Sequence, residues 1–168
     1  YEETVKLSER QWYSLDARNE LIDMLREERR FEEAIAGYGV LLDAIDPGDR
    51  DRSAWVTLAI GDTYRDQGKI EDACKWYEKV PGMDRVSAGI IVESKRRVLE
   101  LKWRDTKTPG VIQGYIQLAN ETGDREQRGG LMITIARMYR EIGDKGSARQ
   151  WYEETVKLSE RQWYSLDA

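Results

Sequence analysis

Apolar residues recur with a helical period along almost the whole chain. In residues 11–28 they form one stripe of Leu15, Leu21, Ile22 and Leu25. Intervals of three and four residues place such side chains on one face of an α-helix. No segment alternates apolar and polar residues in the way that a half-buried strand does. The pattern therefore predicts an all-α protein.

A second apolar stripe follows the first after a very short link. It lies in residues 31–45 and consists of Phe31, Ala34, Ile35, Tyr38, Leu41 and Leu42. Two helices with so short a connection must be antiparallel neighbours, because there is no chain to carry the second one elsewhere. The only three prolines, Pro47, Pro81 and Pro109, fall between periodic segments, where they would end or begin helices. The chain is thus predicted to be a series of helical hairpins.

One stretch of the sequence occurs twice. The seventeen residues Tyr1 to Ala17 return unchanged as Tyr152 to Ala168, at an offset of 151 residues. We interpret this offset as one sequence period. The pattern predicts helical pairs over residues 11–46, 49–81, 84–122 and 124–158, with 1–10 as the second helix of a preceding period and 159–168 as the start of the next. Turns are expected at residues 8–10 and at their copy, 159–161.

Two of these helical pairs resemble the tetratricopeptide repeat. The resemblance is carried by Thr57, Ile60, Gly61, Tyr64, Gly68, Ile70, Ala73, Tyr77 and Val80 in one pair, and by Ile135, Ala136, Tyr139, Gly143, Ala148 and Tyr152 in the other. In the pair 11–46, Ile22 stands where the family has a small residue and Arg29 where it has glycine. The pair 84–122 departs further, with Gly114 in the close-packing place. The resemblance implies a right-handed solenoid of antiparallel hairpins, and the predicted pairs give about four of them in each 151-residue period.

The composition excludes several classes of function. No run of eighteen apolar residues is present, so no membrane span is expected. The 27 basic and 32 acidic residues are mixed along the chain without a basic patch, which argues against nucleic-acid binding. Histidine is absent and Cys74 is the single cysteine, which removes the commonest general base and metal ligands. We therefore expect a non-enzymatic protein without a metal or a cofactor.

A helical hairpin in a repeat array needs a neighbour on each side to cover its apolar faces. The repeated stretch is therefore predicted to be a seam that joins one period to the next, either through the covalent chain or by contact between chains. The residues expected to be buried at this seam are Val5, Leu7, Trp12, Tyr13, Leu15, Val156, Leu158, Trp163, Tyr164 and Leu166.

Two functions remain from the sequence. The favoured one is a structural, non-enzymatic scaffold that continues end to end into a longer array or filament, with protein as its only obligate partner. The alternative is a discrete adaptor that binds a peptide in a concave groove, which the resemblance implies is lined by the first helix of each pair. The candidate groove residues are Asp23, Arg26, Trp55, Leu58, Asp62, Arg65, Arg137 and Arg140. Asn120, in the pattern Asn-Glu-Thr, is a possible glycosylation site at a helix end.

Overall fold

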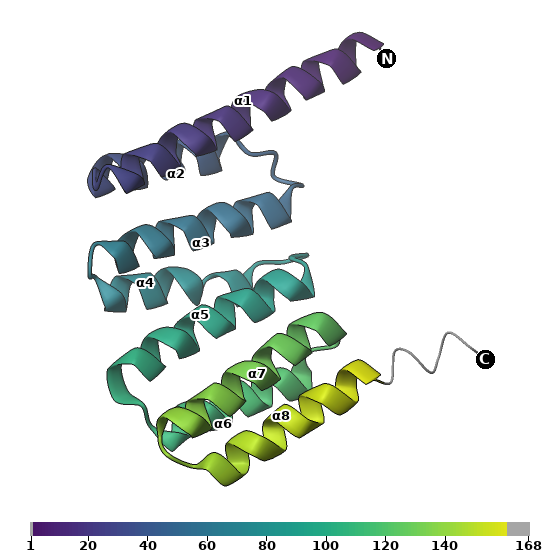
Figure 1. Ribbon diagram of the computed structural model, residues 1–168. Coiled ribbons are helices and arrows are strands. Elements are labelled where there is room, and N and C mark those ends of the chain that lie inside the picture. Colours follow the sequence, from purple (N-terminus) through teal and green to yellow (C-terminus); the bar gives the residue numbers. More distant parts are fainter. Residues whose placement is uncertain (1, 161–168) are drawn as a thin grey trace, which may run out of the picture. The chain divides into compact units, whose positions relative to one another are not determined.

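The fold is all-α, as the sequence predicts. A computed structural model describes the backbone of residues 2–160 and the side chains of residues 13–159, and within this part every regular element is a helix (Figure 1). The chain divides into two compact units, unit 1 with residues 1–90 and unit 2 with residues 91–168. No helix of the described part is long and apolar enough to cross a membrane.

Unit 1 is built from helices that pack in chain order. They are α1 (Glu2–Glu27), α2 (Phe31–Ala44), α3 (Arg50–Asp66) and α4 (Ile70–Tyr77), followed by the 3₁₀ turn η1 (Val80–Gly82). The core of the α1–α2 hairpin contains Ile22, Ala34, Tyr38, Leu41 and Ile45, and Val56 and Ile60 of α3 belong to the same cluster. Helix α3 therefore covers the apolar face of the hairpin that precedes it.

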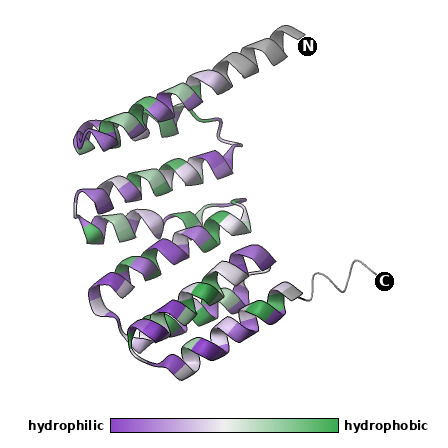
Figure 2. Ribbon diagram, in the orientation of Figure 1, coloured by the Kyte–Doolittle hydropathy of each residue, from purple (hydrophilic) through white to green (hydrophobic). Residues whose placement is uncertain are grey.

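Unit 2 repeats this arrangement. Its helices are α5 (Ala88–Thr106), which spans the boundary between the units, α6 (Pro109–Glu121), α7 (Arg125–Glu141) and α8 (Lys145–Glu160). Buried residues of α5 and α6 form one cluster with three residues of α7, namely Leu131, Ile135 and Met138. Hydrophobic and hydrophilic residues are mixed along the coloured part of each helix, in keeping with one buried and one exposed side (Figure 2).

Three hairpin turns share one backbone geometry. The second residue after the end of the first helix is left-handed in each of them, with φ of 82° at Gly68, 88° at Gly143 and 63° at Arg29. The following amide donates to a carbonyl five residues earlier, at 2.9 Å in all three turns. Glycine takes this conformation without strain, whereas a residue with a Cβ is disfavoured there by about 1 kcal/mol. Arg29 therefore occupies a glycine position at a cost in stability.

The close approach of paired helices is provided by glycine in α3. A Cβ on Gly61 would lie 2.6 Å from Cδ1 of Tyr77, inside the fully buried ring of the partner helix. This explains the small residue that the repeat pattern has at this position.

In the α1–α2 hairpin the small residue at the close approach is on the second helix, α2, and not on the first. A Cβ on Gly37 of α2 would lie 2.9 Å from Cγ1 of Ile22. The α5–α6 pair is built in the same way, because a Cβ on Gly114 would lie 2.7 Å from Cδ2 of Leu99. The large residue at position 22 is thus accommodated by a glycine on the second helix.

Two expectations from the sequence are wrong. Helix α1 runs without a break through residues 8–10, and α8 continues through Ser159 to Glu160, so neither expected turn is present in the described residues. The stretch contains no glycine or proline, and a single serine does not end a helix. Leu21 does not belong to the buried stripe of α1, since 62% of its surface is exposed.

Candidate functional site: three interaction surfaces

The first surface is a network of charged residues on α1 and α3, which we call the α1–α3 charge network. It consists of Asp23 and Arg26 of α1 with Asp62, Arg65 and Asp66 of α3. Asp66 accepts from Nε of Arg26 at 2.6 Å and from Nη2 of Arg65 at 3.0 Å. Nη1 of Arg65 also donates to Asp62 at 2.8 Å. Four of the predicted groove residues are therefore brought together, and their charges are already paired.

Two buried tyrosines donate hydrogen bonds to the aspartates of this network. The hydroxyl of Tyr38 donates to Asp23, and that of Tyr77 donates to Asp62 at 2.7 Å. Burial, followed by the hydrogen bond to Asp23, raises the pKa of Tyr38 above its ordinary value. The tyrosine stays neutral, and its hydroxyl fixes the orientation of the carboxylate. The tyrosines share a position in the repeat pattern, but their bonds to aspartates could not be read from it.

The charges of the network shift its pKa values in favour of the ionised forms. Partial burial acts to raise the pKa of Asp66, but hydrogen bonds from Arg26 and Arg65 outweigh it, and the net pKa lies below the usual value of 3.8. Burial acts to lower the pKa of Arg26, and the bond to Asp66 reverses this effect. Asp66 is thus an ionised link between two successive hairpins.

The two remaining groove candidates of unit 1, Leu58 and Trp55, differ in their exposure to solvent. Leu58 is fully buried, so the expectation that it lines a groove is wrong, because a side chain inside the core cannot meet a ligand. Trp55 is 48% exposed and lines a hollow between α1 and α3. The charged residues of this hollow are Asp16, Glu20, Asp49 and Arg52. Arg52 pairs with Asp16 at 3.3 Å and with Asp49 at 3.4 Å.

In unit 2 the candidate groove residues Arg137 and Arg140 lie exposed on α7. Neither makes an ion pair with any residue in the range 13–159. They therefore differ from Arg26 and Arg65 of unit 1, whose charges are paired within the chain.

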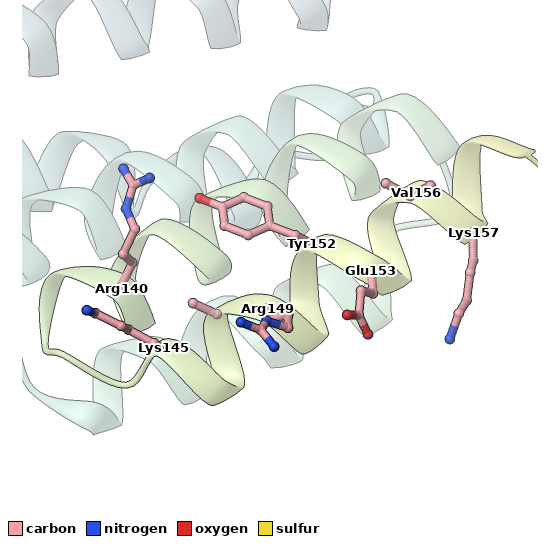
Figure 3. Close-up of a pocket in the computed structure, with 8 residues that line it drawn as sticks. Arg140, Lys145, Arg149, Tyr152, Glu153, Val156 and Lys157 are labelled. Carbon is pink, nitrogen blue, oxygen red and sulfur yellow. The ribbon is translucent and has the colours of Figure 1, made fainter.

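The second surface is the outer side of the last hairpin, which we call the α7–α8 end face. A hollow of about 590 Å³ is floored by Ala148, Tyr152 and Val156 of α8. Charged side chains surround it: Arg140, Lys145, Arg149, Glu153 and Lys157 (Figure 3). Arg140 comes from α7 and the other four from α8. The surface is an apolar floor with a mainly basic rim.

A second hollow lies at the other end of this hairpin. It is lined by Gly129, Gly130 and Ile133 of α7 and by Thr155 and Leu158 of α8, among others. A Cβ on Gly130 would meet nothing within 4 Å. The two glycines lie inside α7, which begins at Arg125.

Comparison with the other hairpins shows what this surface lacks. The second helices α2, α4 and α8 each carry alanine followed four residues later by tyrosine. Ala34, Tyr38, Ala73 and Tyr77 are completely buried, whereas Tyr152 is only half-buried and lines the open hollow. In unit 1, α3 packs on the face of α2 that carries this pair. No helix of the described residues does so for α8.

The third surface is the exposed side of α1, which we call the α1 outer face. Tyr13, Leu21 and Met24 are 74%, 62% and 54% exposed, and Ala17 lies between them on the same helical face. Leu21 precedes the alanine of the next helix by thirteen residues, as do Ile60 in α3 and Ile135 in α7. The equivalent residues form three sets: Ala17, Leu21 and Met24; Val56, Ile60 and Thr63; Leu131, Ile135 and Met138. The members from α3 and α7 are all buried. Helix α1 thus exposes the face that its counterparts bury.

The predicted seam residues are only partly accessible to description. The side chains of Val5, Leu7 and Trp12, and the whole of Trp163, Tyr164 and Leu166, lie outside the described residues. Leu15 packs against the unit 1 core and Leu158 is half-buried, whereas Tyr13 and Val156 are exposed. Burial of the exposed pair at a seam stays a prediction.

The remaining candidates can be placed briefly. Asn120 is exposed near the end of α6, while Thr122 of the same pattern is buried and donates its hydroxyl to the carbonyl of Leu118 at 2.6 Å. Glycosylation at Asn120 stays a prediction. Among the described residues no group of three His, Cys, Asp or Glu could hold a metal ion.

Helical hairpins whose successive members cover one another define a helical-repeat protein. Two models of the tetratricopeptide repeat match the chain, one over residues 58–85, which include most of α3 and α4, and one over residues 130–161, which include most of α7 and α8. These two helical pairs are therefore tetratricopeptide-like repeats, as their sequence pattern predicts. Such repeats are protein-interaction scaffolds and generally not enzymes. A search of curated proteins found no match.

Proposed function

We propose that this scaffold associates end to end, so that the α1 outer face of one period covers the α7–α8 end face of another. One observation carries the proposal: α1 exposes apolar residues whose equivalents on α3 and α7 are buried, and the Tyr152 side of α8 is open whereas the equivalent side of α2 is covered by α3. The identity of residues 1–17 and 152–168 supports it, because residues 161–168, which follow α8, repeat residues 10–17 of α1.

The energetics favour covering both faces. Leu21 and Met24 are long apolar side chains, and burying such a side chain is worth about 1.5–3 kcal/mol relative to exposure. Burial of Tyr152 and Val156, which line the hollow, would also be favourable in free energy. An interface of this kind is heterologous, because the two surfaces differ, and it propagates into an array unless the rotation between copies closes a ring.

The test is the state of association of the protein with Leu21 replaced by glutamate. Leu21→Glu should shift the protein to monomers in sedimentation velocity across a concentration series. Val40→Glu is the matched control, because Val40 of α2 is equally exposed, at 63%, and lies outside the α1 outer face. Electron microscopy of the unaltered protein should show elongated particles. The proposal would be refuted if the unaltered protein were monomeric at every concentration, or if the Leu21→Glu and Val40→Glu variants associated equally.

A second candidate is peptide binding in the hollow between α1 and α3. It is favoured by the half-exposed ring of Trp55 above a lining with more acidic than basic residues. Such a site suits a peptide with basic side chains. Titration with a lysine-rich peptide should change tryptophan fluorescence, and Trp55→Ala should abolish the change. Equal binding by that variant would exclude the hollow.

A further inference from the structure

An ion pair joins successive hairpins within unit 1. Nε of Arg26 on α1 donates to Oδ2 of Asp66 on α3 at 2.6 Å. Arg26 lies eight residues before Ala34, and Asp66 lies seven residues before Ala73. The pair therefore connects one fixed position of a hairpin with one fixed position of the hairpin that covers it.

The same two positions are open at the surfaces proposed to meet. Arg140 lies eight residues before Ala148, on the rim of the α7–α8 end face. Glu27 lies seven residues before Ala34 and is exposed at the end of α1. Neither side chain forms an ion pair within residues 13–159.

We infer that Glu27 of one copy pairs with Arg140 of a second copy, in the place that Asp66 and Arg26 occupy in unit 1, and that this pair sets the register of the contact. The inference rests on the proposed end-to-end association. The charges around Arg140 and Glu27 are complementary. Lys145 and Arg149 line the same hollow as Arg140, and Glu20 lines a hollow together with Glu27. Opposite charges at matching positions steer association and disfavour other registers.

The proposed occupant of the hollow is a second copy, and the chain's own residues 161–168 are the alternative that the experiment distinguishes from it. Those residues copy positions 10–17 only, and the repeated stretch contains no counterpart of Glu27. If the chain's own residues filled the hollow, Glu27 would have no effect on association. Charge changes at this position therefore distinguish the two occupants.

The experiment exchanges the two charges in the full chain. Glu27→Arg alone and Arg140→Glu alone place like charges at the contact, and each should raise the dissociation constant about tenfold or more in sedimentation velocity at low salt. The variant that carries both changes should recover association close to that of the unaltered protein. An equimolar mixture of the two single variants should associate as well, since each joint then holds one acid and one base. Asp43→Arg is the control, because Asp43 is exposed on α2 and makes no ion pair in the described part of the chain.

Recovery in the double variant and in the mixture supports the pairing, provided that circular dichroism shows all variants folded. Association that is weakened in the single variants but not recovered in the double one would overturn it, as would single variants that associate like the unaltered protein. In both cases the end-to-end proposal would stand. If the unaltered protein is monomeric throughout, with the hollow filled by its own chain or by another protein, both proposals fail.

Discussion

Replacement of Gly61 by alanine should destabilise the protein although alanine is the better helix former. The new Cβ would stand 2.6 Å from Cδ1 of Tyr77, about 1 Å inside an ordinary carbon contact. The ring is fully buried, and its hydroxyl is held at 2.7 Å from Asp62, so it cannot tilt without loss of that bond. Overpacking costs about 1–3 kcal/mol and a lost hydrogen bond about 1 kcal/mol, while the helix propensity of alanine returns about 1 kcal/mol. We expect a net loss of about 2 kcal/mol.

The matched control is Gly130→Ala in α7. Gly130 also lies inside a first helix, but a Cβ there meets nothing within 4 Å. Only the propensity gain of about 1 kcal/mol applies. The two alanine variants should therefore differ by about 3 kcal/mol in opposite directions. Urea unfolding followed by circular dichroism measures the change, and hydrogen exchange in α3 and α4 locates it in unit 1. A Gly61→Ala protein with an unchanged urea midpoint would show that the close approach does not fix these helices.

Three further changes test the local structure. Arg29→Gly should stabilise the protein by about 1 kcal/mol in urea unfolding, because glycine takes the left-handed conformation of this turn without strain. Leu58→Ala should cost about 2–5 kcal/mol and Trp55→Ala about 1 kcal/mol or less, since only Leu58 is completely buried. Asp66→Asn should cost about 1 kcal/mol at pH 7, discounted for the partial exposure of its ion pairs. The folded-state pKa of Asp66 lies below 3.8, so this difference should persist above pH 3.8 and vanish as the pH falls through that pKa; a difference that is constant with pH would refute the ion-pair assignment.

The sequence predicts the hairpins because their causes are local. Helical period, Gly68 and Gly143 at the turns and Gly61 at the close approach are all visible as letters. The departures of the first hairpin could not be read in the same way. Gly37 compensates Ile22 from the other helix, and this is a contact between residues fifteen positions apart whose meaning depends on the packing. A comparison with the repeat pattern one position at a time shows only that Ile22 is too large, and not that Gly37 makes room for it.

The outer face of α1 shows a different limit. Leu21 adjoins the buried Ile22 in sequence, and helical periodicity alone assigned both to one stripe. A helix in a repeat array has two apolar sides, one toward its partner and one toward the preceding hairpin. Which side Leu21 belongs to follows only from its equivalence with Ile60 and Ile135, whose neighbours the structure supplies.

The distribution of paired and unpaired charges distinguishes the α1–α3 charge network from the two surfaces of the end-to-end proposal. A ligand that uses Arg26 or Arg65 must first break bonds of 2.6–3.1 Å to aspartates that would be left partly buried. Breaking an ion pair by engaging one partner leaves the other uncompensated, which costs more than the pair itself contributes. Arg140 and Glu27 form no ion pair within the described part of the chain, so a partner can bind them without breaking one. Their charges can be engaged without loss elsewhere, so the surfaces most ready to bind protein are the α7–α8 end face and the α1 outer face rather than the charge network between α1 and α3.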